Sequence, residues 1–280
     1  MNYRVLGRTN LQVSAVSLGG AYLMGSDPEQ QVEHTRQVVQ RAADLGINYI
    51  DTAPLYGKSE ILLGEALAQV AAKFTIATKV GYDPVDFDYR ADSVLRSLAR
   101  SVQRLRVDKL NIAQIHEVNM AGWERIMEPG GTLAGLRAAQ AQGLCDYIGI
   151  TGRAIPLLAQ LAATGEFDTM LVYSDYHPGT QLAAETVFPT AAAQTMGVVI
   201  GTPLANNLFA HNPQRAEALA KLEDSAMRQR VEAWLASVAG LPGSVPEHAF
   251  RFILADARVS TVSSGAGTVA QLEEVAQAAA

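Results

Sequence analysis

The sequence has very little cysteine and no long apolar run. Cys145 is the only cysteine in 280 residues, which excludes an intramolecular disulfide framework and a zinc site built on several cysteines. No stretch reaches the roughly 18 consecutive apolar residues of a membrane-spanning helix, and the first residues lack the apolar core of a signal peptide. We therefore expect a cytoplasmic protein with no membrane partner.

Charge is also scarce. Only 18% of the residues are charged, against about 25% in an average globular domain, and 28 acidic residues outnumber 22 basic ones. The net charge of -6 and the absence of a Lys/Arg run argue against nucleic acid as a partner. The five histidines show no metal-ligand spacing with carboxylates on one helix face, so no metal site is expected.

Apolar residues, in contrast, make up 49% of the chain and follow a repeating pattern. Eight short apolar runs span residues 13–18, 48–51, 74–79, 110–116, 147–151, 170–174, 197–201 and 259–263. Segments of helical period alternate with them at 29–45, 59–71, 91–105, 133–142, 155–163, 182–196, 246–257 and 269–279. Eight strands alternating with eight helices predict a (β/α)8 TIM barrel, an α/β fold that forms a single domain over residues 1–280.

A doubly wound open sheet is the competing fold. Its dinucleotide-binding motif, GxGxxG, would follow the first strand, but here Gly19-Gly20 is followed by Ala21-Tyr22-Leu23. The absence of this motif favours the barrel.

Two segments lie outside the repeat. Residues 1–12 contain Gly7-Arg8-Thr9-Asn10, a candidate two-residue turn, and predict an N-terminal β-hairpin lid over the bottom of the barrel. Residues 204–240, with a polar helical segment at 215–234, are too long for a simple connection. They predict an insertion after strand 7, on the side where barrel enzymes keep their active sites.

Four polar side chains occur at the ends of consecutive predicted strands or just after them. Asp51 ends the second strand and Tyr56 follows it, Lys79 ends the third strand, and His116 ends the fourth. Each alone has an ordinary structural explanation, such as a helix cap for Asp51 or loop packing for Tyr56. Because active sites lie at the carboxyl ends of barrel strands, their shared position favours a catalytic role for all four.

The chemistry of this set is proton transfer to or from a carbonyl or hydroxyl oxygen. A phenol has a pKa near 10, and a neighbouring ammonium lowers that pKa by stabilising the phenolate. A carboxylate keeps the ammonium charged, and a histidine can orient the substrate oxygen. None of these side chains accepts electrons, so a redox reaction needs a cofactor such as nicotinamide.

Residues 46–60 (GINYIDTAPLYGKSE), with LGEAL at 63–67 and ATKVG at 77–81, resemble the aldo-keto reductase superfamily, and the similarity runs from Leu6 to Glu274. The resemblance implies that Tyr56 is the general acid/base, that Lys79 and Asp51 lower its pKa, and that His116 orients the substrate. It also implies an NAD(P)-dependent oxidoreductase that binds its cofactor in extended form across the barrel mouth.

Further motifs, among them DFDYR at 86–90 and YIGITG at 147–152, are similar to the galactose and D-threo-aldose 1-dehydrogenase branch. That branch oxidises sugar hemiacetals at C1 to lactones by hydride transfer to NAD+, and related members oxidise pyridoxal. Two alternatives remain open: an NADPH-dependent reductase of aldehydes or ketones, and a cofactor-binding regulatory protein of the same fold.

The resemblance also implies a set of cofactor contacts. The matching positions are Gly20, Thr151, Tyr173, Thr202, Pro203, Leu204, Ser264, Gly265, Gly267, Gln271 and Glu274. The chain departs from the common pattern at Leu171, often Gln, at Gly201, often aromatic, and at Val275, often Asn. At Gly267 many members carry an Arg that would pair with a 2′-phosphate, so we expect NAD to be preferred over NADP.

The sequence says less about the substrate pocket and the oligomeric state than about the cofactor contacts. Candidate substrate-binding residues in the loops after strands are Tyr22, Tyr82, Trp123 and Asp175, with loop packing as the alternative for each. Their aromatic rings suit a sugar ring and a pyridine ring equally well, so we expect a small-molecule carbonyl or sugar substrate. The alanine-rich segments 182–196 and 269–279 fit packing on the barrel or on a partner, which leaves a monomer or a small homo-oligomer.

Overall fold

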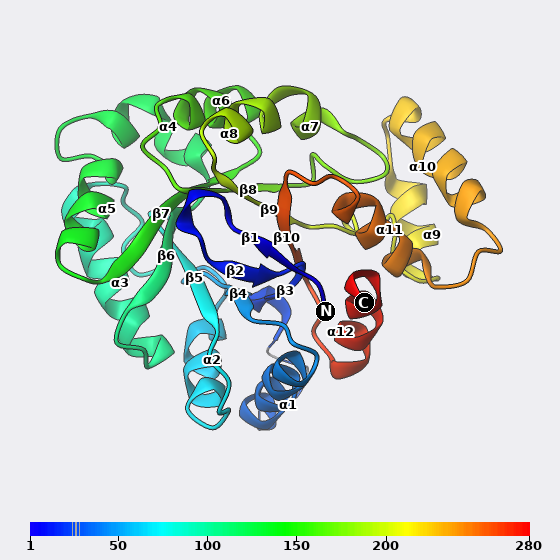
Figure 1. The fold of residues 1–280 in the computed structure, drawn as a ribbon, viewed down its shortest axis with the longest axis horizontal. Coiled ribbons are helices and arrows are strands. Elements are labelled where there is room, and N and C mark those ends of the chain that lie inside the picture. The colour runs from blue at the N-terminus through cyan, green and yellow to red at the C-terminus, as the bar shows by residue number, and fades with distance from the viewer. Residues whose placement is uncertain (24, 26, 28) are drawn as a thin grey trace.

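A computed structural model describes residues 1–23, 25, 27 and 29–280. Eight parallel strands close into a barrel in chain order, with the last strand paired to the first (Figure 1). They are β3 (Val16–Gly19), β4 (Tyr49–Asp51), β5 (Thr75–Val80), β6 (Leu110–Ile115), β7 (Cys145–Gly152), β8 (Thr169–Tyr173), β9 (Gly197–Gly201) and β10 (Val259–Ser264). The predicted (β/α)8 barrel is confirmed.

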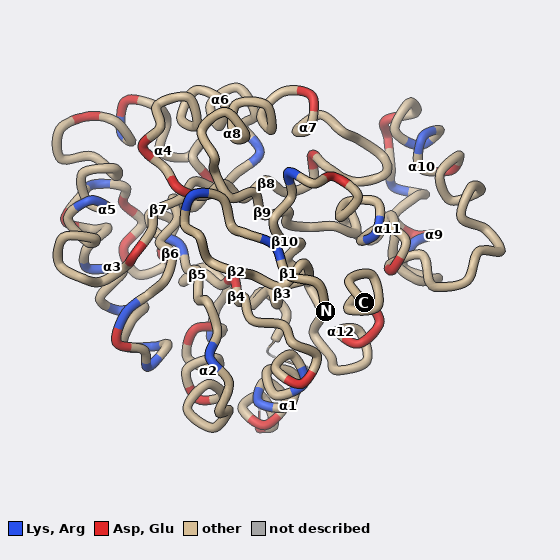
Figure 2. The backbone as a smooth tube through the Cα atoms, in the orientation of Figure 1, with Lys and Arg blue, Asp and Glu red and all other residues tan. Residues whose placement is uncertain are grey.

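Helices surround this barrel (Figure 1). They are α1 (Gln31–Asp44), α2 (Ser59–Leu67), α3 (Ala91–Leu105), α4 (Val118–Met127), α5 (Thr132–Ala141), α6 (Ile155–Ala163), α7 (Leu182–Thr186), α8 (Phe188–Ala193), α9 (Gln214–Lys221), α10 (Ser225–Val238), α11 (Val245–Leu254) and α12 (Val269–Ala276), with 3₁₀ turns at Gly7–Thr9, Gly20–Tyr22 and Gln277–Ala279. Charges of both signs are spread over the outer helices (Figure 2). None of the helices in the described part of the chain is long and apolar enough to cross a membrane.

Several element boundaries differ from the sequence prediction. The helix expected at 182–196 is two short helices, because Pro189 in the first turn of α8 has no N–H to continue α7. The run at 13–18 is shared between a hairpin strand and β3, and the polar segment at 215–234 lies in two helices, α9 and α10. Helix α4, directly after β6, was not predicted.

The core has two parts because strand side chains alternate between the two faces of the barrel wall. Those that face outward pack under the surrounding helices; in α3, for example, Val94, Leu98 and Leu105 are fully buried. Those that face inward form a separate cluster across the barrel axis. Its buried members are Leu6, Val13, Tyr49, Ala77, Ile112, Leu171 and Val199.

The predicted hairpin lid is present. Strand β1 (Tyr3–Val5) pairs antiparallel with β2 (Gln12–Ser14), and the pair lies across one end of the barrel (Figure 1). Its connection is longer than the expected two-residue turn: residues 6–11 include the 3₁₀ turn and a left-handed Asn10 with φ 58°. This longer loop allows Leu6 to insert into the barrel axis, where Gly197 leaves room for it.

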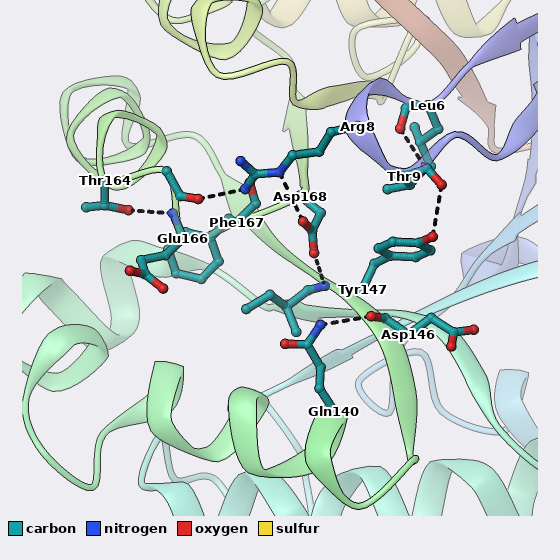
Figure 3. Close-up of polar contacts among 12 residues, drawn as sticks. Leu6, Arg8, Thr9, Gln140, Asp146, Tyr147, Thr164, Glu166, Phe167 and Asp168 are labelled. Carbon is teal, nitrogen blue, oxygen red and sulfur yellow. Dashed lines mark hydrogen bonds and ion pairs between the residues drawn. The ribbon is translucent and has the colours of Figure 1, made fainter.

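Arg8 anchors this lid to the barrel (Figure 3). Its guanidinium donates to the backbone carbonyls of Gly165 and Phe167 at 2.7 and 2.5 Å and to the Asp168 carboxylate at 3.1 Å. The second Asp168 oxygen accepts the backbone N–H of Ile148 at 3.0 Å. One arginine therefore connects the hairpin to the loop before β8 and, through Asp168, to β7.

The insertion after β9, the seventh barrel strand, is also confirmed. Helices α9 and α10 stand out to one side of the ring of helices (Figure 1). They pack through a small apolar cluster of their own, in which Phe209, Val231 and Ala249 are buried. The segment that leads into them, residues 204–214, runs along the carboxyl end of the barrel and contributes to the cleft described next.

Candidate active site

A cleft of about 870 Å³ lies at the carboxyl ends of the barrel strands, at the end away from the hairpin. Every barrel strand contributes to its lining, either with its own last residues or with the residue that follows. The insertion and helices α11 and α12 complete its walls. This volume lies within the usual range of ligand and cofactor sites.

The ion pair between Asp51 and Lys79 forms the floor of the cleft. Lys79 Nζ lies 2.6 Å from Asp51 Oδ2 and donates a second hydrogen bond to the carbonyl of Thr52 at 2.8 Å. Both side chains are buried. Burial lowers the pKa of Lys79, but the charge of Asp51, the neighbouring Tyr56 and the hydrogen bonds to both together outweigh it, so the pKa is raised and the ammonium stays charged.

Tyr56 lies beside this pair. Lys79 Nζ is 4.8 Å from the centre of the phenol ring, and the ring meets His116 edge to face with centroids 5.9 Å apart. Burial raises the pKa of Tyr56, Lys79 opposes that effect, and Asp51 and Glu117 add to it. The net pKa of Tyr56 is above its ordinary value, so of the expected pKa-lowering pair only Lys79 acts in the expected direction.

His116 is held neutral. Burial, followed by the positive charge of Lys79, lowers its pKa to about 3. Its backbone carbonyl accepts a hydrogen bond from the Tyr89 hydroxyl at 2.6 Å, which fixes the end of β6. A neutral imidazole carries one N–H, which it can donate to an oxygen in the cleft without changing its charge. The four residues Asp51, Tyr56, Lys79 and His116 are called the polar cluster below.

The residues predicted to contact the cofactor all line the same cleft. Its lining includes Gly20, Thr151, Tyr173, Thr202, Pro203, Leu204, Ser264, Gly265, Gly267, Gln271 and Glu274. The buried Ser264 hydroxyl has no hydrogen-bond partner within the described chain, and such an orphaned group at a cleft wall fits a ligand. Among the described residues that line the cleft, Lys79 is the only lysine or arginine.

Two of the departures from the family pattern have a visible local explanation. Tyr173 on β8 pairs with Gly201 on β9, and a Cβ at Gly201 would come within 3.0 Å of Tyr173 Cβ. The Tyr173 ring therefore provides an aromatic side chain beside Gly201, the position at which many family members carry one. At Gly267 a Cβ would come within 2.8 Å of the Tyr22 carbonyl, so a side chain there requires the backbone to shift.

The four candidate substrate residues are not brought together. Tyr22 lines the cleft and is 68% exposed. Tyr82 packs on His116 with ring centroids 5.7 Å apart. Trp123 lies on α4, and Asp175 pairs with Arg153 at 3.4 Å; neither belongs to the cleft lining.

Three residues of this site were not among those predicted from the sequence. Gln114 donates to Asp51 Oδ1 at 2.9 Å and lies near the end of β6, two residues before His116, a spacing that could have revealed it. Glu117 follows His116 and lines the cleft only because its backbone is left-handed, with φ 57°, which no pattern signals. His211 of the insertion contacts Glu274 of α12 at 2.7 Å, which ties the insertion to the far wall.

No group of three or more potential metal ligands occurs among the residues that the structure describes. The arrangement is that of a proton-transfer site. A phenol is flanked by a buried ammonium and a neutral imidazole, and the cleft that they line is also bordered by the insertion and by helices α11 and α12.

Comparisons with known proteins agree with this geometry. A model of the Aldo/keto reductase family matches residues 15–280. L-galactose dehydrogenase of Arabidopsis thaliana is 28% identical over 281 residues, which cover 97% of this chain and 86% of that protein. D-threo-aldose 1-dehydrogenase of a Pseudomonas species is 25% identical over 301 residues, which cover 96% and 89%.

The same architecture occurs in a solved structure of an aldo-keto reductase from Bacillus halodurans. It superimposes with a TM-score of 0.81 at 24% identity and covers 99% of this chain and 90% of that one. At this identity the likeness concerns the fold. Together with the family match, it confirms the resemblance inferred from the sequence motifs.

Proposed function

The chain belongs to the aldo/keto reductase family of oxidoreductases, and from this premise we propose that it oxidises an aldose or a related sugar hemiacetal at C1 to a lactone, with NAD+ as the hydride acceptor. The observation that carries the proposal is the polar cluster at the end of an extended cleft. The two relatives described above are named as dehydrogenases of aldoses, which supports the substrate class.

In this reaction Tyr56 is the general base, and as a phenolate it takes the proton of the C1 hydroxyl. Lys79 stabilises that phenolate from 4.8 Å, and Asp51 keeps the ammonium charged and in place. His116 donates its N–H to the reacting oxygen. A bound nicotinamide supplies the hydride acceptor that the side chains lack. In the reverse direction the same residues protonate an aldehyde oxygen.

The preference for NAD is supported by the charges in the described part of the cleft. A 2′-phosphate is normally bound by arginine or lysine, and the only such residue in the lining is Lys79, which is paired with Asp51. Gly267 offers no side chain, and Glu274 adds a carboxylate to that wall. We propose that the substrate lies at the other end of the cleft, near Tyr56 and His116, with the Tyr82 ring packed behind His116. Tyr22 packs against Gly265 and Gly267 and therefore belongs to the cofactor end.

Steady-state kinetics test this function. NAD+ and NADP+ are compared on pentoses, hexoses, deoxysugars and pyridoxal by the absorbance of the reduced cofactor. We expect aldose oxidation with NAD+ favoured at least about tenfold, and a Tyr56→Phe variant that binds NADH as the wild type does but loses the chemical step by about 10²-fold or more.

Other outcomes identify the alternatives. NADPH-dependent carbonyl reduction without aldose oxidation identifies a reductase. Unchanged rates in Tyr56→Phe on every substrate identify a cofactor-binding protein without catalysis by this site.

A further inference from the structure

Glu117 presents a carboxylate in the cleft that the proposed reaction does not use. It directly follows His116 and occupies the position before the first residue of α4. A carboxylate there ordinarily accepts a backbone N–H of the helix, but the Glu117 side chain makes no such hydrogen bond. Its left-handed backbone, with φ 57° and ψ 73°, is unfavourable for a glutamate and turns the residue toward the cleft that it lines.

One oxygen of this carboxylate has a defined partner. The Tyr173 hydroxyl donates to Glu117 Oε1 at 2.6 Å. Burial and then this hydrogen bond raise the pKa of Tyr173, so the phenol remains the donor. The Arg153 guanidinium lies over the Tyr173 ring, 5.9 Å from its centre. The orientation of Glu117 is therefore fixed by a neighbour that is itself held in place.

The second oxygen, Oε2, accepts no hydrogen bond from any described residue, and no described lysine or arginine forms an ion pair with Glu117. Arg153, the nearest arginine on this side, is paired with Asp175 instead. At the reactive end of the cleft the charges of Asp51 and Lys79 cancel, which leaves Glu117 as a net negative charge. This carboxylate oxygen can therefore accept a hydrogen bond from a molecule bound in the cleft.

We propose that Glu117 is a specificity-determining residue: its free oxygen accepts a hydrogen bond from a hydroxyl group beside the reacting carbon, and its charge excludes anionic carbonyl compounds. The inference rests on the proposed function and narrows its substrate class to neutral polyhydroxylated compounds. 2-Oxo acids, which carry a carboxylate beside the reacting carbon, would place a second negative charge next to Glu117 and are disfavoured.

The role of Glu117 can be tested in the reductive direction, by comparing kcat/KM for three small aldehydes with NADH. Lactaldehyde carries a hydroxyl beside the carbonyl, propanal lacks it, and glyoxylate carries a carboxylate in its place. We expect the wild type to prefer lactaldehyde to propanal and to reject glyoxylate. Glu117→Leu should lower kcat/KM for lactaldehyde about 10- to 100-fold and leave propanal within about threefold, because the acceptor of the hydroxyl is lost.

Glu117→Gln removes the charge and keeps the length of the side chain. It should raise the glyoxylate-to-propanal ratio of kcat/KM about tenfold or more. Glu124→Gln, an exposed glutamate on α4, is the matched control and should leave every ratio unchanged. Propanal turnover in each variant reports that the site is still assembled.

The inference is overturned if the wild type shows no preference for lactaldehyde over propanal, or if both Glu117 variants keep the wild-type ratios. A change confined to the KM for NADH, equal for all three aldehydes, overturns it as well and assigns Glu117 to the cofactor. Failure of the proposed function looks different, because no aldose is then oxidised with NAD+ while the aldehyde ratios still depend on Glu117.

Discussion

The effect of the Lys79 ammonium can be measured in this site, because burial and the charge of Lys79 change the pKa of Tyr56 in opposite directions. Burial raises the pKa of the phenol, and Lys79 is the group that lowers it. The alkaline limb of the oxidation rate therefore depends on Lys79, whereas His116, with a pKa of about 3, is neutral throughout the working range. No rate transition near pH 6.5 is expected from this histidine.

Replacing Lys79 with methionine should shift the alkaline limb upward by at least about one pH unit and slow oxidation at pH 8 about 10²- to 10³-fold, since the phenolate loses its stabilising charge. The pH dependence of kcat/KM measures both effects. Lys58→Met is the matched control, because Lys58 is exposed and lies two residues after Tyr56. An unmoved limb in Lys79→Met would show that this ammonium does not set the pKa of Tyr56.

At the level of elements, the N-terminal hairpin depends on two arginine side chains more than on its own short strands. Arg8 makes three hydrogen bonds to the loop before β8, two of them to backbone carbonyls, and Arg4 donates to three backbone carbonyls between Leu254 and Val259. A three-residue strand pair is too short to be stable in isolation. The hairpin is therefore held by Arg8, by Arg4 and by the burial of Leu6 and Val13 in the barrel axis.

Arg8→Met should reduce the free energy of unfolding by about 1–3 kcal/mol, because Asp168 loses its charged partner and two carbonyls lose their donor. Denaturant titration measures the change. Arg137→Met is a useful comparison: Arg137 bonds Glu166 nearby at the surface, and its loss should cost only about 0–1 kcal/mol. Equal effects of the two substitutions would argue against Arg8 as the anchor. Aldose oxidation should not change, since the hairpin lies at the other end of the barrel.

Most of the barrel elements could be predicted from the sequence, but helix α4 and some site residues could not. The alternation of apolar runs and helical segments predicted the barrel because both periodicities are local, and the strand-end rule then placed Asp51, Lys79 and His116 at one mouth. Helix α4 was missed because its segment has no clear apolar period and contains a non-helical Gly122. The Glu117 carboxylate was missed because its direction depends on one backbone angle. The hydrogen bond between His211 and Glu274 joins segments far apart in the chain, which local patterns do not specify.

At the scale of the whole molecule, two buried histidines tie stability to pH. Burial lowers the pKa of His116 to about 3 and that of His177 to about 4, against 6.5 for an exposed histidine. Below pH 6.5 the unfolded chain binds protons at both positions and the folded protein does not. Stability is therefore lost as the pH falls from 6.5 toward 4, by up to about 1.4 kcal/mol per pH unit for each histidine.

Together the two histidines make the free energy of unfolding decrease as the pH falls from 6.5 to 5. In His177→Asn this decrease per pH unit should be smaller by about half of their joint contribution. His177 is the better target, because its ring lies outside the polar cluster and packs on Phe209. Denaturant titrations at several pH values give the slope. His34→Asn is the comparison, since that histidine is only partly buried. A slope that is the same in His177→Asn and in the wild type would mean that His177 is protonated in the folded protein.

The barrel closes where β10 pairs with β3, which joins strands from the two ends of the chain. Such a distant pairing carries a large loop-closure entropy and is expected late in folding. The cleft crosses this seam, with Gly20 on one side and Ser264, Gly265 and Gly267 on the other. We expect a dinucleotide bound there to contact both ends of the chain and to oppose opening of the seam by mass action. Resistance to unfolding should then rise with the concentration of the cofactor.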